Sequence, residues 1–148
     1  MRHEHYMRLA LEQADLARRK GEVPIGAVAL MNGKVIAGAH NSPISETDPT
    51  AHAEILVLRS AAEKLGVYRL EGLEIYVTLE PCLMCFGAML HARVARLVYG
   101  ADDPKVGLSL ILESRLQEAH FNHRIEIVRG VLAEECSAIL QDFFQGKR

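Results

Sequence analysis

Two short clusters of histidine, glutamate and cysteine constrain the fold of this chain more than any other feature of its sequence. The first is His52-Ala53-Glu54 and the second is Pro81-Cys82-Leu83-Met84-Cys85. Cysteines at positions i and i+3 project from one face of a helix, so both sulfurs can reach a single metal ion, and His52 can complete the ligand set from a neighbouring helix. A fold that uses all three side chains must bring two helix starts together.

The residue types in these clusters indicate a catalytic zinc site. Three protein ligands leave one of the four tetrahedral positions open for water, so we predict one zinc ion held by His52, Cys82 and Cys85. The positive ends of the two helices favour thiolate over thiol. Glu54 is not needed as a ligand, and we predict that it carries protons between the water, the substrate and the departing amine.

Either cluster alone would be a weak signal, because Cys-x-x-Cys also occurs in redox motifs and in structural zinc sites. Their combination, with proline before the first cysteine, favours the catalytic interpretation. A third cysteine, Cys136, is predicted to be a small buried residue. If Cys136 joined the metal it would close the site and favour a structural role.

Periodicity and turn signals predict an α/β fold with a mixed, roughly five-stranded sheet covered by helices on both faces. Asn32-Gly33 joins two β-prone runs and predicts an antiparallel hairpin. Asp48-Pro49 reads as a helix start, and the strand, helix and strand that follow favour a parallel crossover. The predicted helices are 3–20, 49–65, 81–92 and 133–144, and the predicted strands are 23–31, 34–39, 73–79, 94–99 and 124–128.

Length and composition favour one domain that spans residues 1–148, since the chain has 148 residues and shows neither a linker nor a repeat. The first twenty residues hold no apolar stretch typical of a signal peptide. Three cysteines are an odd number and too few for a disulfide framework. We therefore expect a cytoplasmic protein. The net charge of −2 shows no overall excess of basic residues, so an RNA substrate would have to be bound by a local basic patch.

The two clusters together resemble the zinc-dependent nucleobase deaminases. Further stretches are similar to the bacterial tRNA adenosine deaminases, so that the resemblance covers nearly the whole chain. These stretches are Glu22-Val23-Pro24-Ile25-Gly26-Ala27-Val28, Asp48-Pro49-Thr50, Tyr76-Val77-Thr78-Leu79-Glu80, Asn122-His123-Arg124 and Asp142-Phe143-Phe144.

This resemblance implies a three-layer α/β/α cytidine-deaminase-like fold, a homodimer, and hydrolytic conversion of the wobble adenosine of a tRNA anticodon to inosine. By position, it implies that Asn41 hydrogen-bonds the flipped-out base and that Ile25 and Leu79 line the base pocket. It also implies that Asp103 and Asn122 contact neighbouring nucleotides. The segment 108–121 and His40 depart from the family's pattern, and both differences bear on the RNA-contacting surface.

Two alternatives stay open at the level of sequence. The same metal chemistry would serve a deaminase of a free nucleobase or nucleoside, of guanine or cytosine type, because the ligand motif does not distinguish these bases. A non-catalytic RNA-binding module with structural zinc is the alternative from another class.

Overall fold

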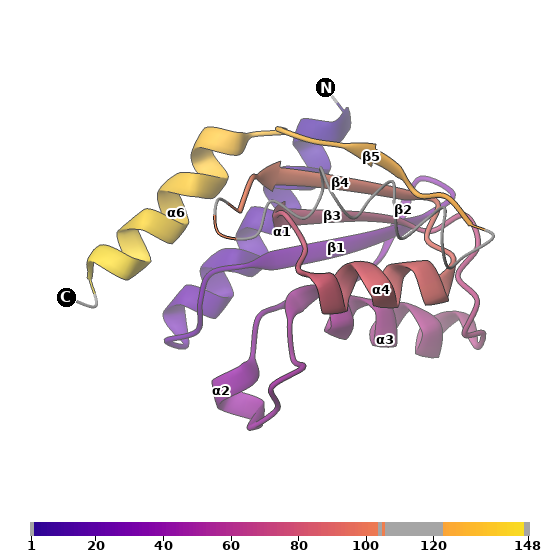
Figure 1. The fold of residues 1–148 in the computed structure, drawn as a ribbon, viewed down its shortest axis with the longest axis horizontal. Helices are drawn as coiled ribbons and strands as arrows, with labels where there is room; N and C mark the ends of the chain where they lie inside the picture. Colours follow the sequence, from indigo (N-terminus) through magenta and orange to yellow (C-terminus); the bar gives the residue numbers. More distant parts are fainter. Residues whose placement is uncertain (1, 104, 106–122, 147–148) are drawn as a thin grey trace.

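The computed structural model describes residues 2–103, 105 and 123–146 (Figure 1). The helices are α1 (Arg2–Arg19), α2 (Pro43–Glu46), α3 (Ala53–Leu65), α4 (Leu83–Ala92) and α6 (Ala133–Gln145). The strands are β1 (Gly26–Met31), β2 (Lys34–His40), β3 (Glu74–Leu79), β4 (Arg96–Ala101) and β5 (Glu126–Val128). Among the described residues, element types and order agree with the prediction, apart from α2, which lies between the predicted strand 34–39 and the predicted helix 49–65.

The sheet has five strands in the order β2-β1-β3-β4-β5, which confirms the predicted mixed sheet. β1 pairs antiparallel with β2 and with β3. β3 pairs in parallel with β4, and β4 with β5, so the predicted crossover through α4 is also confirmed. The hairpin turns at Asn32 and Gly33, whose φ angles of 53° and 77° are the positive values that such two-residue turns require.

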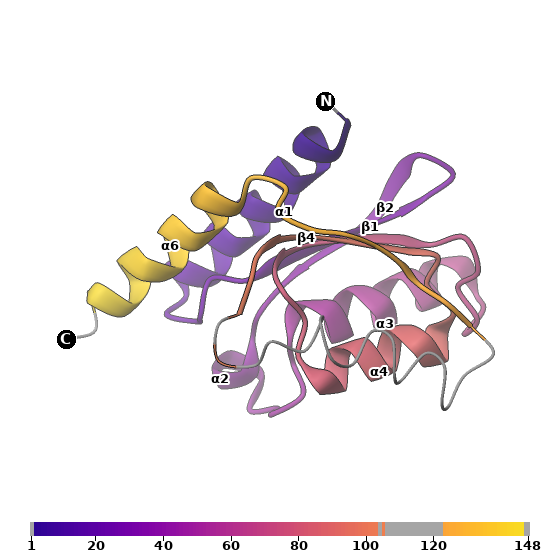
Figure 2. The same cartoon turned by 45° about the horizontal axis from the view of Figure 1, so that its top comes forward.

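Helices cover both faces of the sheet and produce the predicted three layers (Figure 2). On one face α1 packs against β1 and β3 and α6 packs against β4, whereas α3 covers β1 and β2 on the other face beside α4. Each face has its own apolar core. Gly26 allows α1 to approach β1 closely, since a Cβ atom at this position would come within 2.1 Å of the Ala10 carbonyl oxygen.

The predicted start of the second helix is wrong. Asp48 does not cap a helix at Pro49; its carboxylate accepts hydrogen bonds from the backbone N–H and the hydroxyl of Thr50, and the chain stays non-helical until α3 begins at Ala53. The third helix likewise begins at Leu83 instead of Pro81. These shifts make His52 and Cys82 the N-cap residues of α3 and α4.

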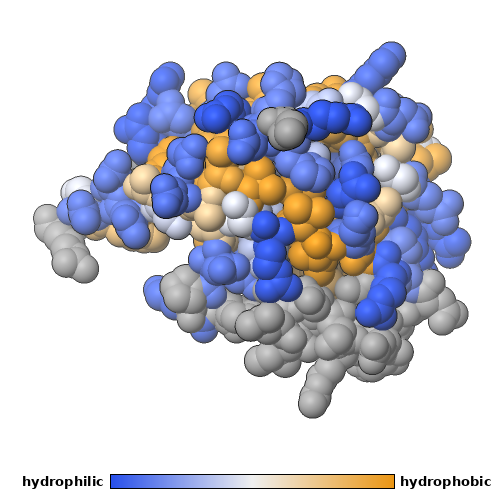
Figure 3. All heavy atoms as spheres, turned by 90° about the horizontal axis from the view of Figure 1, so that it is seen from above, coloured by the Kyte–Doolittle hydropathy of each residue, from blue (hydrophilic) through white to orange (hydrophobic). Residues whose placement is uncertain are grey.

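Figure 3 shows the face seen from above Figure 1, where β5 forms the edge of the sheet. Apolar side chains gather in the middle of this face and hydrophilic ones surround them. In the part of the chain that the structure describes, no helix is both long enough and apolar enough to span a membrane.

Candidate metal centre and active site

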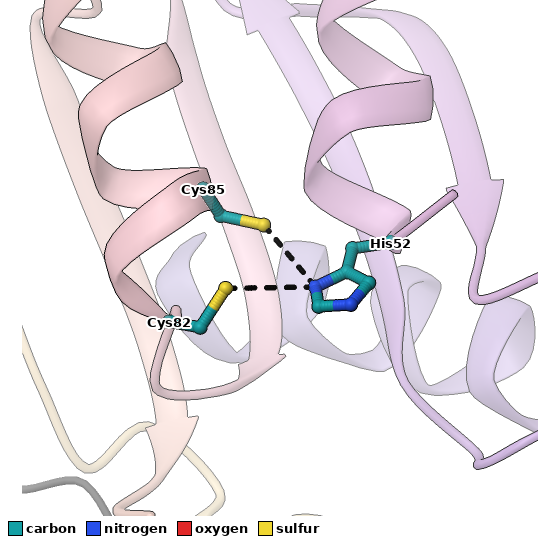
Figure 4. A group of neighbouring side chains, drawn as sticks. All are labelled: His52, Cys82 and Cys85. Carbon is teal, nitrogen blue, oxygen red and sulfur yellow. Dashed lines mark hydrogen bonds between the residues drawn. The ribbon is translucent and has the colours of Figure 1, made fainter. Parts of the chain in front are cut away.

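The structure brings the side chains of His52, Cys82 and Cys85 together in one cluster (Figure 4). Nδ1 of His52 lies 3.6 Å from Sγ of Cys82 and 3.5 Å from Sγ of Cys85. The three ligand atoms all lie within 4.8 Å of one another, and among the described residues this is the group of three or more His, Cys, Asp or Glu side chains that could hold a metal ion. The predicted ligands therefore share one site.

The positions of these residues on their helices explain why the side chains meet. His52 and Cys82 are N-cap residues with extended backbone angles, and neither uses its side chain to cap its own helix. Their carbonyl groups still accept the first helical hydrogen bonds, from Leu56 and Phe86. Both side chains are therefore free to project from the helix ends toward each other, and Cys85 adds a second sulfur one turn into α4.

The two cysteines differ in their acid–base behaviour. A hydrogen bond from Cys85 outweighs the effect of burial and lowers the pKa of Cys82 to about 4, with further help from His52. The same hydrogen bond, together with burial and the neighbouring Glu54, raises the pKa of Cys85 far above its usual value. The hydrogen bond with Cys82 also raises the pKa of His52. The surroundings therefore favour the thiolate at Cys82 and the thiol at Cys85.

Glu54 lies in the first turn of α3, and its side chain is buried with only 4% of its surface exposed. Burial raises the pKa of this carboxyl group to about 7, and the group interacts with Cys82, His52 and Cys85. A carboxyl group that titrates near neutrality can both accept and donate a proton under physiological conditions. Glu54 therefore stands beside the cluster in a state suited to proton transfer.

Four of the predicted substrate-contacting residues lie at the same end of the sheet as the cluster. Ile25 precedes β1, Asn41 follows β2, Leu79 ends β3 and Asp103 follows β4. The backbone N–H of Asn41 donates to the Ile25 carbonyl, which joins two of these positions directly. Asn122 lies outside the described residues, as does the divergent segment 108–121.

Asn41 carries an unusual buried group. Its side chain is only 6% exposed, and its Oδ1 atom is a buried polar atom for which the described part of the protein offers no hydrogen-bond partner. A buried acceptor without a partner costs free energy unless a ligand or water satisfies it. The amide oxygen is therefore available to accept a hydrogen bond from a bound molecule.

Sequence reasoning missed the part played by Glu80. This carboxylate is 4% exposed and accepts a hydrogen bond from the backbone N–H of Asp103 at 2.8 Å. It thus ties the segment after β4 to the turn that leads into Cys82. The available signal was a charged residue placed between an apolar strand and Pro81, where burial of a charge requires partners.

Cys136 agrees with its prediction as a small buried residue. It is fully buried in the core on the α1 and α6 face, and its sulfur lies so close to Gly100 that a Cβ atom there would come within 2.4 Å. Burial raises the pKa of this thiol to about 12. Cys136 is not part of the His52 cluster.

Comparison with known proteins places the chain in a family. Residues 1–148 match the family described as MafB19-like deaminase. The tRNA-specific adenosine deaminase of Bacillus subtilis (strain 168) is 52% identical over 145 residues, which cover 98% of this chain and 90% of that protein.

Two solved structures share the fold. One, from studies of A-to-I editing by tRNA:A34 deaminases at the wobble position of transfer RNA, matches with a TM-score of 0.86 and 45% identity over 92% of this chain and 99% of that chain. A guanine deaminase from Nitrosomonas europaea matches with a TM-score of 0.82 and 25% identity over 95% of this chain and 83% of that chain. With the site and the full-length likeness together, the chain belongs to the family of tRNA-specific adenosine deaminases.

Proposed function

We propose that this protein hydrolyses the wobble adenosine of a tRNA anticodon to inosine and ammonia. The observation that carries the proposal is the 52% identity to a tRNA-specific adenosine deaminase over 98% of the chain, in a protein whose His/Cys/Cys cluster and adjacent Glu54 lie together. Membership of this family also supports a homodimer in the cytoplasm, built from one domain per chain.

Zinc is the metal that the cluster fits best. One imidazole nitrogen and two sulfurs form a donor set typical of zinc. Bond lengths of about 2.3 Å to sulfur and about 2.0 Å to nitrogen, at a tetrahedral angle, place the two ligand atoms about 3.5 Å apart. The distances from Nδ1 of His52 to the two sulfurs are 3.6 and 3.5 Å. His52, Cys82 and Cys85 would thus hold the ion with little movement.

When bound, zinc supplies a Lewis acid that makes water nucleophilic near neutral pH. The protein's own side chains transfer the protons between the water and the base. The Glu54 carboxyl group, with a pKa raised to about 7, can take a proton from the attacking water and pass one to a ring nitrogen of adenine. It can then take the second proton of that water, from the hydroxyl group now bonded to the ring carbon, and pass it to the amino group. The C=O bond forms as the C–N bond breaks, so that one water enters and one ammonia departs.

Asn41 is the strongest candidate for binding the base. Its buried Oδ1, which has no hydrogen-bond partner among the described residues, can accept a hydrogen bond from a ligand. Ile25 and Leu79, each half-buried at the same end of the sheet, supply apolar surface for a flipped-out base. By their match to the family's pattern, Asp103 and Asn122 would contact neighbouring nucleotides.

A guanine deaminase is the second candidate, because a protein of that activity shares the fold with a TM-score of 0.82. The two functions are separated by incubating the zinc-loaded protein with an anticodon stem-loop that carries a wobble adenosine and, in parallel, with free guanine. Inosine in the RNA, measured by nucleoside mass spectrometry, supports the proposal. Ammonia released from free guanine alone contradicts it.

A further inference from the structure

Glu22 is a buried carboxylate that no step of the proposed chemistry uses. It lies between α1 and β1 with only 1% of its surface exposed. Its Oε2 atom accepts hydrogen bonds from the backbone N–H of Ser45 at 2.6 Å and from the Ser45 hydroxyl at 2.5 Å, and its Oε1 atom accepts one from the backbone N–H of Ile44 at 3.2 Å. A charge at this depth is retained only with such partners.

These hydrogen bonds cap helix α2 from a distant part of the chain. The first N–H groups of a helix have no partner within it, and the N-cap side chain normally supplies one. Here the N-cap residue Ser42 makes no side-chain cap, since its hydroxyl donates to the His40 carbonyl at 3.0 Å. Burial opposes ionisation of Glu22, but the hydrogen bonds from Ser45 and Ile44 outweigh it and lower the pKa of this carboxyl group. The ionised carboxylate thus fills the role that Ser42 leaves open.

Helix α2 lies in the segment that joins Asn41 to the metal ligand His52. On the His52 side the segment has its own anchor, because Asp48 accepts two hydrogen bonds from Thr50. On the Asn41 side, the nearest tertiary side-chain anchor in the described structure is the carboxylate of Glu22 beneath Ile44 and Ser45. The two ends of the segment are joined by the hydrogen bond from the Ser42 N–H to the Ala51 carbonyl, but they have different side-chain anchors, one near the metal and one near the substrate.

We propose that Glu22 is a positioning residue that holds the start of α2 so that the amide oxygen of Asn41 stays directed at the substrate base. The inference rests on the proposed function, in which Asn41 contacts the base. Glu22 acts through the backbone, because it caps α2 next to Asn41 while the Asn41 N–H is held by the Ile25 carbonyl. Loss of the cap leaves the zinc ligands in place and weakens substrate binding.

A double-mutant cycle between Glu22 and Asn41 tests this coupling with the zinc-loaded protein and the wobble-adenosine stem-loop. Glu22→Gln keeps the shape of the side chain but places an amide N–H₂ against a backbone donor. We expect it to raise KM about tenfold with kcat within about twofold and an unchanged zinc content. In an Asn41→Ala background the same change should alter KM by less than about twofold.

Equal effects of Glu22→Gln in the two backgrounds, or an unchanged KM in the wild-type background, would overturn the proposal. Glu74→Gln is the matched control, since it removes a partly buried carboxylate at the other end of the sheet and should leave KM unchanged.

If Glu22→Gln does not fold, Ser45→Ala takes its place in the cycle. Ser45→Ala removes one of the three hydrogen bonds to Glu22, and we expect KM to rise about threefold. In the Asn41→Ala background, the same substitution should leave KM unchanged.

Failure of the proposed function gives a different result from failure of this inference. A wild-type protein that converts guanine and leaves the stem-loop unchanged contradicts the proposed function, and the same cycle measured on guanine then tests Glu22. A wild-type protein that forms inosine, with additive effects of the two substitutions, contradicts only the inference.

Discussion

The two ends of the central sheet carry charged groups that are balanced in different ways. At the end where β3 and β4 begin, Arg96 lies between Glu74, at 2.6 Å, and Glu126, at 2.9 Å. The hydrogen bond with Glu126, followed by attraction to Glu74, raises the pKa of Arg96. The two carboxylates thus stabilise the charged form of Arg96, and all three groups are partly exposed to solvent.

The opposite end, with His52, Cys82, Cys85 and Glu54, is not balanced in this way. Burial pushes Glu54 toward its neutral form, while one cysteine of the pair is pushed toward thiolate and the other toward thiol. These acidic groups compete for protons, and a cation would resolve the competition. In the structural cluster the charged groups stabilise one another, whereas in the functional cluster their charges remain unbalanced until a ligand binds.

Removing a ligand at the unbalanced end should have the largest effect. We expect Cys82→Ser to lose the zinc ion, because a neutral hydroxyl replaces a thiolate, and to lose all measurable deamination. The thermal midpoint should fall by about 5 °C or more, since bound metal stabilises the folded state. Metal analysis and calorimetry measure both effects. Full zinc content in this variant would show that the cluster does not hold the ion as proposed.

Glu54→Gln separates catalysis from metal binding at the same end of the sheet. The variant keeps the shape of the side chain but cannot accept a proton, so kcat should fall at least about a hundredfold. Zinc content should stay that of the wild type, because Glu54 is not among the three grouped ligands. Single-turnover assays measure the loss. Deamination at the wild-type rate would remove Glu54 from the mechanism.

Glu22 lies near the active end of the sheet, but hydrogen bonds stabilise its charge as ion pairs do at the far end. Its pKa is lowered from 4.5, so the stability that it contributes is present above about pH 4.5 and is lost as the pH falls through the lower pKa of the folded state. Glu22→Gln should cost about 2 kcal/mol of unfolding free energy at neutral pH. Denaturant titrations should show this difference shrinking below the ordinary carboxyl range. A difference that grows on acidification contradicts the assignment.

The smallest effect is expected at the far end. Glu74→Gln removes one of two ion pairs of Arg96, and partly exposed pairs contribute about 0.5–1 kcal/mol. Deamination should stay within about twofold of wild type. A tenfold loss of kcat/KM in this variant would show that the ion pairs at the far end of the sheet contribute to activity, which contradicts a purely structural role for them.

Local patterns explain which parts of the fold were predictable. The Asn32-Gly33 turn dictates its backbone angles within two residues, and the hairpin formed as predicted. The His52 and Cys82 clusters are likewise short-range signals. They converge because β2 and β3 run in the same direction, so that α3 and α4 both begin at the same end of the sheet. The resemblance to tRNA adenosine deaminases, carried by stretches along most of the chain, is confirmed.

The missed features depend on contacts between distant residues. Helix α2 is capped by Glu22, and the late start of α3 follows from a non-helical segment in which the Ser42 N–H donates to the Ala51 carbonyl. Asp48-Pro49 has the composition of a helix start, but its carboxylate is used by a turn at Thr50. Glu22 and Glu80 hold their segments through backbone N–H groups of residues far along the chain, which no local pattern encodes.

X-ray absorption at the zinc edge of the wild-type protein tests directly whether the metal site is open. We predict one zinc ion per chain with two sulfur ligands at about 2.3 Å and two lighter ligands at about 2.0 Å, one from His52 and one from solvent. Three or four sulfur ligands, or a stoichiometry near zero after growth with zinc, would contradict an open metal site built from His52, Cys82 and Cys85.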